Sequence, residues 1–325
     1  MRPGVSIARA ACLLPALACA CSGGKTVVLG SGSPIPYHFD APVLVPELAS
    51  ISRTDNPTLT GDLLEIYFTT DRASGNGDVW FATRSSADAP FGTPAAVTAV
   101  NGATFETSSA ISADGLTLWF GSDRAGGAGA NDIWVSQRSN RTSDWSTPLN
   151  VVALNSAADD IPRPPGQHEL VMPMASERAT PYEYQTYLAP RPTTGAPFGA
   201  PVAIPELDNI YAGRSIVDGF LTDDGLTLFF SSAPASQAAD AGVTRDAGAS
   251  LDGGRAGDAG AANSDLFVAW RRSTSEAFGF TVPLSDLNTA ADERDPWLTP
   301  DGTTLYFTSD RGGVLNIYTA RVQPR

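Results

Sequence analysis

Charged side chains recur just before five short apolar segments of this 325-residue chain, and their types differ from one segment to the next. Carboxylates and guanidinium groups that converge could bind a cation or a polar ligand. Two such carboxylates could also act as the acid and base of glycoside hydrolysis. Ordinary solvated loop charge is the alternative interpretation. The candidate binding residues are Asp55, Glu106, Asp160, Arg163, Arg214, Glu293, Arg294 and Asp295, with Asp159 and Asp218 beside them.

Other familiar catalytic patterns are missing from the sequence. The only histidines, His38 and His168, are far apart and no cysteine follows Cys21, which disfavours a zinc site. The sequence contains neither a Gly-x-Ser-x-Gly elbow nor a phosphate-binding loop. A net charge of −14 disfavours nucleic acid as a partner, because phosphate binding needs a basic surface. We therefore expect no cofactor, with calcium bound by aspartates as the alternative.

Internal repeats supply the elements that must position the candidate residues. Four aromatic residues that open similar segments, Phe39, Phe91, Trp145 and Phe198, are separated by 52, 54 and 53 residues, and Phe278 opens a looser fifth copy. A hairpin pattern interleaves with them: residues 301–321 read DGTTLYFTSDRGGVLNIYTAR, with copies starting at Asp62 and Asp114. Each repeat of about 50 residues thus offers four short strands, which is typical of a β-propeller blade.

The repeats predict an all-β fold, a single β-propeller at 37–325 with five four-stranded blades, six being the alternative. The chain starts on an outermost strand and stops after Asn316–Ala320, so we expect the N-terminal strand Pro42–Leu48 to dock there and close the ring. The candidate residues then lie where each innermost strand begins, at one mouth of the axial channel. Residues 234–262 contain repeated Asp-Ala-Gly triplets and predict a disordered insertion.

Asp-Arg pairs follow the third strand of several repeats, at Asp71-Arg72, Asp123-Arg124 and Asp310-Arg311. Residues that recur in several blades usually have a structural role, whereas a catalytic site occurs only once in the ring. We therefore expect a structural clasp, in which the Asp caps backbone N–H groups and the Arg reaches a carboxylate. The fourth repeat has Ala233-Pro234 at this place instead.

The hairpin motif resembles that of a known family. Residues 299–311 with Asn316-Ile317-Tyr318 resemble the WD40-like PD40 repeat of TolB-type β-propellers, and residues 112–124 and, in part, 222–232 repeat the motif. The resemblance implies the propeller fold. It does not imply TolB's role in the outer membrane, because a TolB protein carries a second domain and usually six blades.

The N-terminus reads as a processing signal. Arg2 and Arg9 precede the apolar run 10–18, and residues 18–24 (ACACSGG) resemble a bacterial lipobox. We expect a lipoprotein signal peptide at 1–20, lipidation at Cys21 (Cys19 being the alternative) and a flexible tether at 21–36. A cleaved secretory signal is the other interpretation. The anchor predicts a location in the bacterial envelope, at the outer membrane or in the periplasm.

These features predict a non-catalytic envelope module, more simply a binding scaffold than an enzyme, whose partners are envelope proteins or peptides. Glycans are the alternative partners, and a carbohydrate-active propeller that uses channel carboxylates is the alternative function. A propeller that serves only as a stable display platform is a third interpretation. Contact with the membrane is expected through the lipid anchor only.

Overall fold

The computed structural model describes residues 37–73, 76–208, 214–234 and 263–323, all within one compact unit from Tyr37 to Arg325. The predicted signal peptide, the tether and Cys21 lie outside the described residues. So does the predicted insertion from residue 235 to residue 262.

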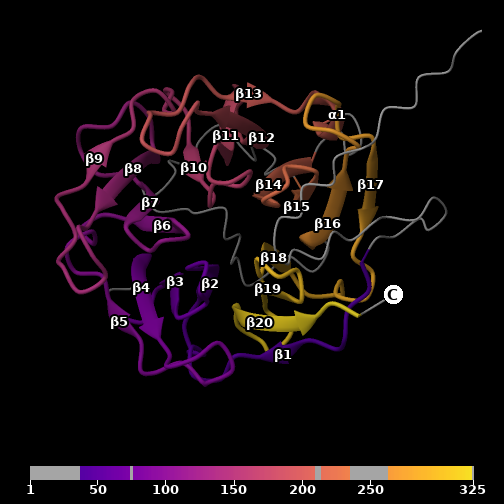
Figure 1. The fold of residues 1–325 in the computed structure, drawn as a ribbon, viewed down its shortest axis with the longest axis horizontal. Helices are drawn as coiled ribbons and strands as arrows, with labels where there is room; N and C mark the ends of the chain where they lie inside the picture. Colours follow the sequence, from indigo (N-terminus) through magenta and orange to yellow (C-terminus); the bar gives the residue numbers. More distant parts are fainter. Residues whose placement is uncertain (1–36, 74–75, 209–213, 235–262, 324–325) are drawn as a thin grey trace, which may run out of the picture. The chain divides into compact units, whose positions relative to one another are not determined.

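The described strands form five four-stranded antiparallel sheets, which stand side by side around a ring with their first strands innermost (Figure 1). The chain is therefore a five-bladed β-propeller, as the repeats predict. Blade 1 contains β2 (Thr54–Leu59), β3 (Glu65–Thr70), β4 (Asp78–Thr83) and β5 (Ala95–Ala96); blade 2 contains β6 (Glu106–Ile111), β7 (Thr117–Ser122), β8 (Asp132–Gln137) and β9 (Leu149–Asn150). Blade 3 contains β10 (Asp160–Pro162), β11 (Val171–Thr180), β12 (Glu183–Pro190) and β13 (Val202–Ala203), followed by the short helix α1 (Pro205–Asp208). Blade 4 contains β14 (Arg214–Leu221), β15 (Thr227–Pro234), β16 (Asp265–Trp270) and β17 (Phe280–Pro283); blade 5 contains β18 (Glu293–Leu298), β19 (Thr304–Ser309), β20 (Asn316–Arg321) and β1 (Val43–Leu44).

The ring closes by pairing the two ends of the described chain. Strand β1 lies antiparallel to β20, with Val43 opposite Thr319. The Val45 N–H donates to the Ile317 carbonyl at 3.0 Å, and Phe39 forms an isolated bridge with Val322. The predicted N-terminal strand thus docks where it was expected, although regular pairing covers two residues rather than seven. Figure 1 shows β1 beside β20 on the outside of blade 5.

Acidic residues cap the turns that connect the first and second strand of four blades. In each, one Asp oxygen accepts a hydrogen bond from a Thr or Ser hydroxyl two residues earlier and from an N–H two residues later, as Asp301 does from Thr299 and Thr303. Such caps satisfy backbone N–H groups in the turn, where the hydrogen bonding between the two strands ends. The capping residues are Asp62, Asp114, Asp224 and Asp301.

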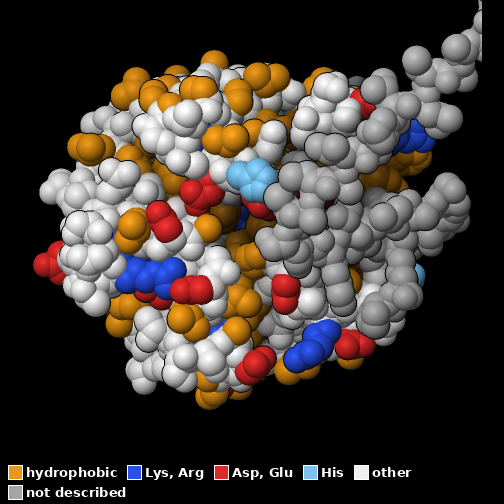
Figure 2. Space-filling model, in the orientation of Figure 1, with side chains coloured by type: hydrophobic (Ala, Val, Ile, Leu, Met, Phe, Trp, Pro, Cys, Tyr) orange, Lys and Arg blue, Asp and Glu red, His pale blue; other side chains and the backbone are white. Residues whose placement is uncertain are grey.

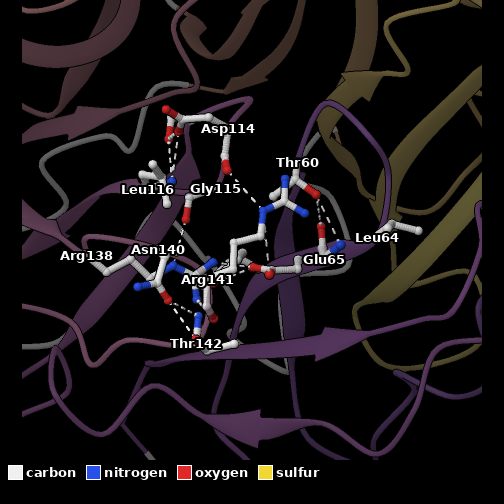
Figure 3. A network of polar contacts seen from close by, with 12 residues as sticks. Thr60, Leu64, Glu65, Asp114, Gly115, Leu116, Arg138, Asn140, Arg141 and Thr142 are labelled. Atoms are coloured by element: carbon white, nitrogen blue, oxygen red, sulfur yellow. Dashed lines mark hydrogen bonds and ion pairs between the residues drawn. The ribbon is translucent and has the colours of Figure 1, made fainter.

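Arginines join these turns to the neighbouring blade. Figure 3 shows Arg138 and Arg141 of blade 2 reaching the turns of blades 1 and 2. The Arg138 guanidinium donates to Glu65 at 2.6 Å, and Arg141 pairs with Asp62 at 2.6 Å. This arrangement ties the two blades together on the face where the turns lie.

Four of the five aromatic anchors of the repeat have a partner that the sequence pattern did not point out. The arginine after the third strand of the blade stacks on the anchor: Arg84 lies 4.4 Å from the Phe91 ring, and Arg191 lies 4.4 Å from the Phe198 ring. The Arg84 Nε also donates to the Leu63 carbonyl of the turn. Trp145 and Phe278 have Arg138 and Arg271 at 4.6 Å. The anchors therefore fix the outermost strand of their blade through cation–π contacts and packing.

The core between blades is built from the central strand of each sheet. Phe68, Phe120, Phe230 and Phe307 are fully buried at corresponding positions. Blade 3 has Met174, 1% exposed, at this position in place of the phenylalanine. Adjacent sheets therefore pack on each other through large side chains, and this packing fixes the ring that surrounds the channel.

Candidate functional site

The eight predicted site residues fall into two groups. Glu106, Asp160 and Glu293 begin their innermost strands and are fully buried. Together with Arg214, they are engaged inside their own blades. The other four, Asp55, Arg163, Arg294 and Asp295, come together around the channel.

A repeated clasp holds the three buried carboxylates. The Arg311 Nη2 donates to the Glu293 Oε1 at 3.0 Å and to the Leu287 carbonyl at 2.8 Å, while its Nε donates to the Ser309 hydroxyl at 3.0 Å. Arg124 holds Glu106 and Arg178 holds Asp160 in the same way. The Asp of the pair caps an N–H, as Asp310 does for Asp292. The predicted structural clasp is confirmed, and its carboxylate partners are three of the predicted site residues.

Blades 1 and 4 vary the clasp. In blade 1 the Arg72 Nη2 donates to the Thr54 hydroxyl and to the Leu48 carbonyl, because Thr54 stands where the carboxylate would be. In blade 4, where Ala233-Pro234 replaces the Asp-Arg pair, Arg214 on the opposite strand donates to the Ser232 hydroxyl at 2.9 Å. Arg214 therefore supplies from β14 the guanidinium that the other blades supply from the end of their second strand.

A bulge turns side chains of four innermost strands toward the axis. Asn56, Ser108, Asp218 and Asp295 all have a positive φ, between 50° and 59°, and pairing shifts register at each. A bulge of this kind re-aims a side chain that regular alternation would place elsewhere. In blade 3 the corresponding residue is Pro162, which cannot adopt this φ, and regular pairing of β10 ends there.

Arg163 follows that proline and occupies the centre of the ring. It is 2% exposed. Its Nη1 donates to the Asn56 Oδ1 at 2.8 Å and to the Asp295 Oδ1 at 3.3 Å, and it lies 4.0 Å from the Asp218 Oδ1. One side chain from blade 3 thus joins bulge residues of blades 1, 4 and 5 and closes the channel at this level.

A small polar recess lies at the mouth where the innermost strands begin. Its volume is about 30 Å³, enough for one or two water molecules. All five blades line it, and its charged lining residues are Asp218, Arg294 and Asp295. The Asn56 and Ser108 side chains complete the polar floor, with Ile161, Val217 and Tyr184 on one side. The Arg294 Nη2 pairs with Asp292 at 2.8 Å.

The buried carboxyl groups of the channel titrate abnormally. Burial, with the nearby negative charge of Asp295, raises the pKa of Asp218 to about 7. Burial also raises the pKa of Asp55 to about 6, against the opposing effect of Arg53. The Arg53 Nη1 lies 3.5 Å from Asp55, but its other nitrogens bond Asp71. The negative charge of each ionised aspartate is therefore only partly balanced by the cations near it.

Some residues of the site carry no clear sequence signal. Asn56 and Ser108 are uncharged, and only the bulge brings them to the axis. The Thr308 hydroxyl donates to the Asp295 Oδ2 at 2.9 Å, but it stands inside an ordinary strand pattern. The sequence signal that could have located part of the set is positional: in blades 1, 2 and 5 the bulge residue stands third in the innermost strand, counted from the clasp residue.

A larger depression of about 440 Å³ lies away from the channel, over the outer part of blade 2. Leu116, Gln137, Arg138 and Asp144 are among its lining residues. It opens broadly to solvent, and Arg138 is already paired with Glu65. Figure 2 shows acidic and basic side chains scattered over the face it views, and not gathered in one patch.

Because the outer depression is open and its arginine is already paired, we take the axial recess as the candidate site.

Comparisons with known proteins agree with the fold. A putative TolB from Agrobacterium tumefaciens is 12% identical, with a TM-score of 0.46, over 90% of this chain and 92% of that chain. An endo-arabinase from Bacteroides thetaiotaomicron is 11% identical, with a TM-score of 0.52, over 89% of this chain and 98% of that chain. An α-L-arabinofuranosidase from Lactobacillus brevis is 13% identical, with a TM-score of 0.46, over 86% and 94%. At these identities the likeness to the endo-arabinase shows the fold alone. No protein-family model and no curated protein matches the chain.

Two further observations on the described residues concern metal ions and the membrane. No group of three or more His, Cys, Asp or Glu residues within them is arranged to hold a metal ion. The same residues include no helix with the length and hydropathy needed to cross a membrane.

Proposed function

We propose that this chain is a cell-envelope lipoprotein whose propeller binds a protein or peptide, without catalysis, at the mouth of its axial channel. The observation that carries the proposal is the Arg163 closure. Because Arg163 fills the axis and leaves a recess of about 30 Å³, a ligand contacts the mouth with its surface and can insert only a small group. The PD40-like motif and the lipobox-like residues 18–24 support the envelope assignment.

The mouth differs from blade to blade, as a specific binding surface requires. Directly before the bulge residue, or before Pro162 in blade 3, blades 1, 2 and 5 have Asp55, Thr107 and Arg294, while blades 3 and 4 have Ile161 and Val217. The clasps beneath these residues are repeated in most blades and act as framework. Of the asymmetric residues, Thr107, Ile161, Val217 and Arg294 line the recess, and we propose that these four contact a ligand.

Pull-down from envelope extracts tests this function, beside a glycan array probed with the same protein. We expect capture of a discrete protein or peptide that is lost when Arg294 is changed to Glu, with Arg321→Glu on the outer strand β20 as the control. Signal on the glycan array alone would refute the protein-binding proposal. Such a result would favour the carbohydrate-active alternative, in which Asp218, with its raised pKa, is suited to a general acid.

The anchor has its own test. Replacing Cys21 with Ala should release the protein from the membrane fraction of the producing bacterium, whereas Cys19→Ala should leave it attached. Unchanged attachment of the Cys21 variant would overturn the proposed lipidation site.

A further inference from the structure

We propose that Asn76 is a modification site, whose side-chain amide water converts to a carboxylate, without an enzyme, through a cyclic imide formed with Gly77. The product is a mixture of aspartate and isoaspartate at residue 76. This inference goes beyond the proposed function and does not depend on the identity of the ligand.

Two Asn-Gly pairs occur in the sequence, Asn76-Gly77 and Asn101-Gly102. In such a pair the backbone nitrogen after the asparagine can attack the Cγ atom of the asparagine side chain. Glycine favours this attack, because it has no Cβ to block the approach and adopts the widest range of backbone angles. By sequence alone, therefore, the two pairs should be equally reactive.

The folded chain holds the second pair away from reaction. Asn101 is half-buried. Its Nδ2 donates to the Val79 carbonyl at 3.0 Å, and its Oδ1 accepts a hydrogen bond from the Val79 N–H at 2.9 Å. The Gly102 nitrogen is engaged as well, because its N–H donates to the Glu106 Oε2 at 2.9 Å. Formation of the imide at this pair would have to break all of these hydrogen bonds.

Asn76 lies in a different setting, in the loop from β3 to β4 at the end of blade 1 where β2 begins. The residue is exposed, so water and hydroxide reach its amide. Among the described residues, none accepts a hydrogen bond from the Gly77 nitrogen. The attacking atom of this pair is therefore not held by another group of the described chain, in contrast to the nitrogen of Gly102.

The reaction consumes only water. The Gly77 nitrogen loses its proton to hydroxide and bonds to the Asn76 Cγ, while the Cγ–Nδ2 bond breaks and the nitrogen leaves as ammonia after taking a proton from water. Water then opens the cyclic imide at one of its two carbonyl carbons. Opening at Cγ gives aspartate, whereas opening at the backbone carbonyl gives isoaspartate, in which the main chain runs through the side chain. Either product carries a negative charge where the amide was neutral.

The modification should reach the channel mouth, because Gly77 packs against a residue of the recess. A Cβ at Gly77 would lie 2.5 Å from the Phe105 ring, and Phe105 lines the recess. The Gly77 carbonyl also accepts a hydrogen bond from the Glu106 N–H, at the start of β6, at 2.9 Å. Isoaspartate adds a methylene to the main chain before Gly77. We therefore expect it to disturb this contact between blades 1 and 2, which aspartate leaves in place.

Incubation of the folded full chain, followed by mass spectrometry of tryptic peptides, tests the proposal. Trypsin separates the two sites, because Arg84 lies between them, and conversion of the amide to an acid changes the mass of the peptide. We expect the Asn76 peptide to convert at least about tenfold faster than the Asn101 peptide. Conversion should be faster at about pH 8 than at about pH 6, because the attacking nitrogen must lose a proton. In protein unfolded by urea the two peptides should convert at similar rates.

Two variants complete the test. Asn76→Gln should abolish the reaction at this residue, because glutamine would have to form a larger ring, and should leave conversion of Asn101 unchanged. Asn76→Asp carries the charge of the product on an unaltered main chain, so the aged protein, which contains isoaspartate, should have a lower thermal midpoint than this variant.

Three results would overturn the modification site: equal conversion of the two peptides in the folded protein, an unconverted Asn76 over the time in which the unfolded protein converts, or aspartate without isoaspartate. A thermal midpoint of the aged protein equal to that of Asn76→Asp would refute the effect on the Phe105 contact.

Discussion

Changing Arg163 to Met is the perturbation that tests the structure of the channel most directly. Methionine keeps an unbranched side chain of similar length but removes the guanidinium, which is 2% exposed and bonds Asn56 and Asp295. Removing one partner of a buried ion pair costs about 3 to 5 kcal/mol, because the other charge remains buried and unpaired. For a chain of this size we expect the thermal midpoint to fall by roughly 10 °C.

The cost should depend on pH in a defined direction. Without Arg163, burial and Asp295 act on Asp218 against only Ser231 and Arg294, so its folded pKa rises further above the unfolded value of about 4. A folded pKa above the unfolded one means that stability is lost as pH rises. The destabilisation should therefore be larger at about pH 8 than at about pH 5, where protonated carboxyl groups tolerate the loss of the cation.

Thermal unfolding followed by circular dichroism at both pH values measures this effect. Adding Asp295→Asn to Arg163→Met should restore part of the loss at high pH, since the double variant removes an uncompensated charge. A cost below about 1 kcal/mol at high pH, or an equal cost at both pH values, would refute the account of Arg163 as the charged centre of the ring.

Three further predictions concern stability. Arg311→Lys should lower the free energy of unfolding by about 2 kcal/mol, because lysine cannot bond Ser309 and the buried Glu293 together. Denaturant unfolding measures this loss beside the exposed Arg321→Lys control, and an equal loss in both variants would contradict the clasp. Val45→Pro should cost about 1 kcal/mol through the lost bond to Ile317 and should speed proteolytic release of the N-terminal strand, whereas an unchanged cleavage rate would count against ring closure by β1. Asp218→Asn should stabilise the protein by up to about 4 kcal/mol at about pH 8, since a folded pKa of about 7 costs stability as pH rises from about 4; a pH–stability profile unchanged by the substitution would argue against this titration.

The fold was largely predictable because its signals are local and repeated. The spacing of Phe39, Phe91, Trp145 and Phe198 fixes the length of a blade, and the Asp-Gly turns mark its hairpins. Turn chemistry is equally local: where Gly115 has a φ of 75°, the first repeat places Leu63 in the same conformation at 64°. The Asp-Arg clasp was predictable for the same reason, since its members recur at constant spacing.

The candidate site was predictable only in part. Glu106, Asp160 and Glu293 stand directly before apolar strands, just as the channel residues do, so the sequence cannot separate clasp carboxylates from mouth carboxylates. The separation depends on side-chain direction, which alternates along a strand and changes at a bulge. Arg214 acts as the clasp arginine of blade 4, and this role likewise depends on the pairing of its strand with the strand that carries Ser232.

The sequence by itself predicted five blades, the place of ring closure and the Asp-Arg pairs of the framework, because the blade pattern is written as a repeat of about 50 residues. Tertiary structure alone decided the centre. Arg163 meets Asn56 and Asp295, which are 107 and 132 residues away along the chain, and no local pattern encodes that encounter. It arises because the closed ring brings five innermost strands to one axis, where a proline in blade 3 takes the place of the bulge and a single arginine fills the space.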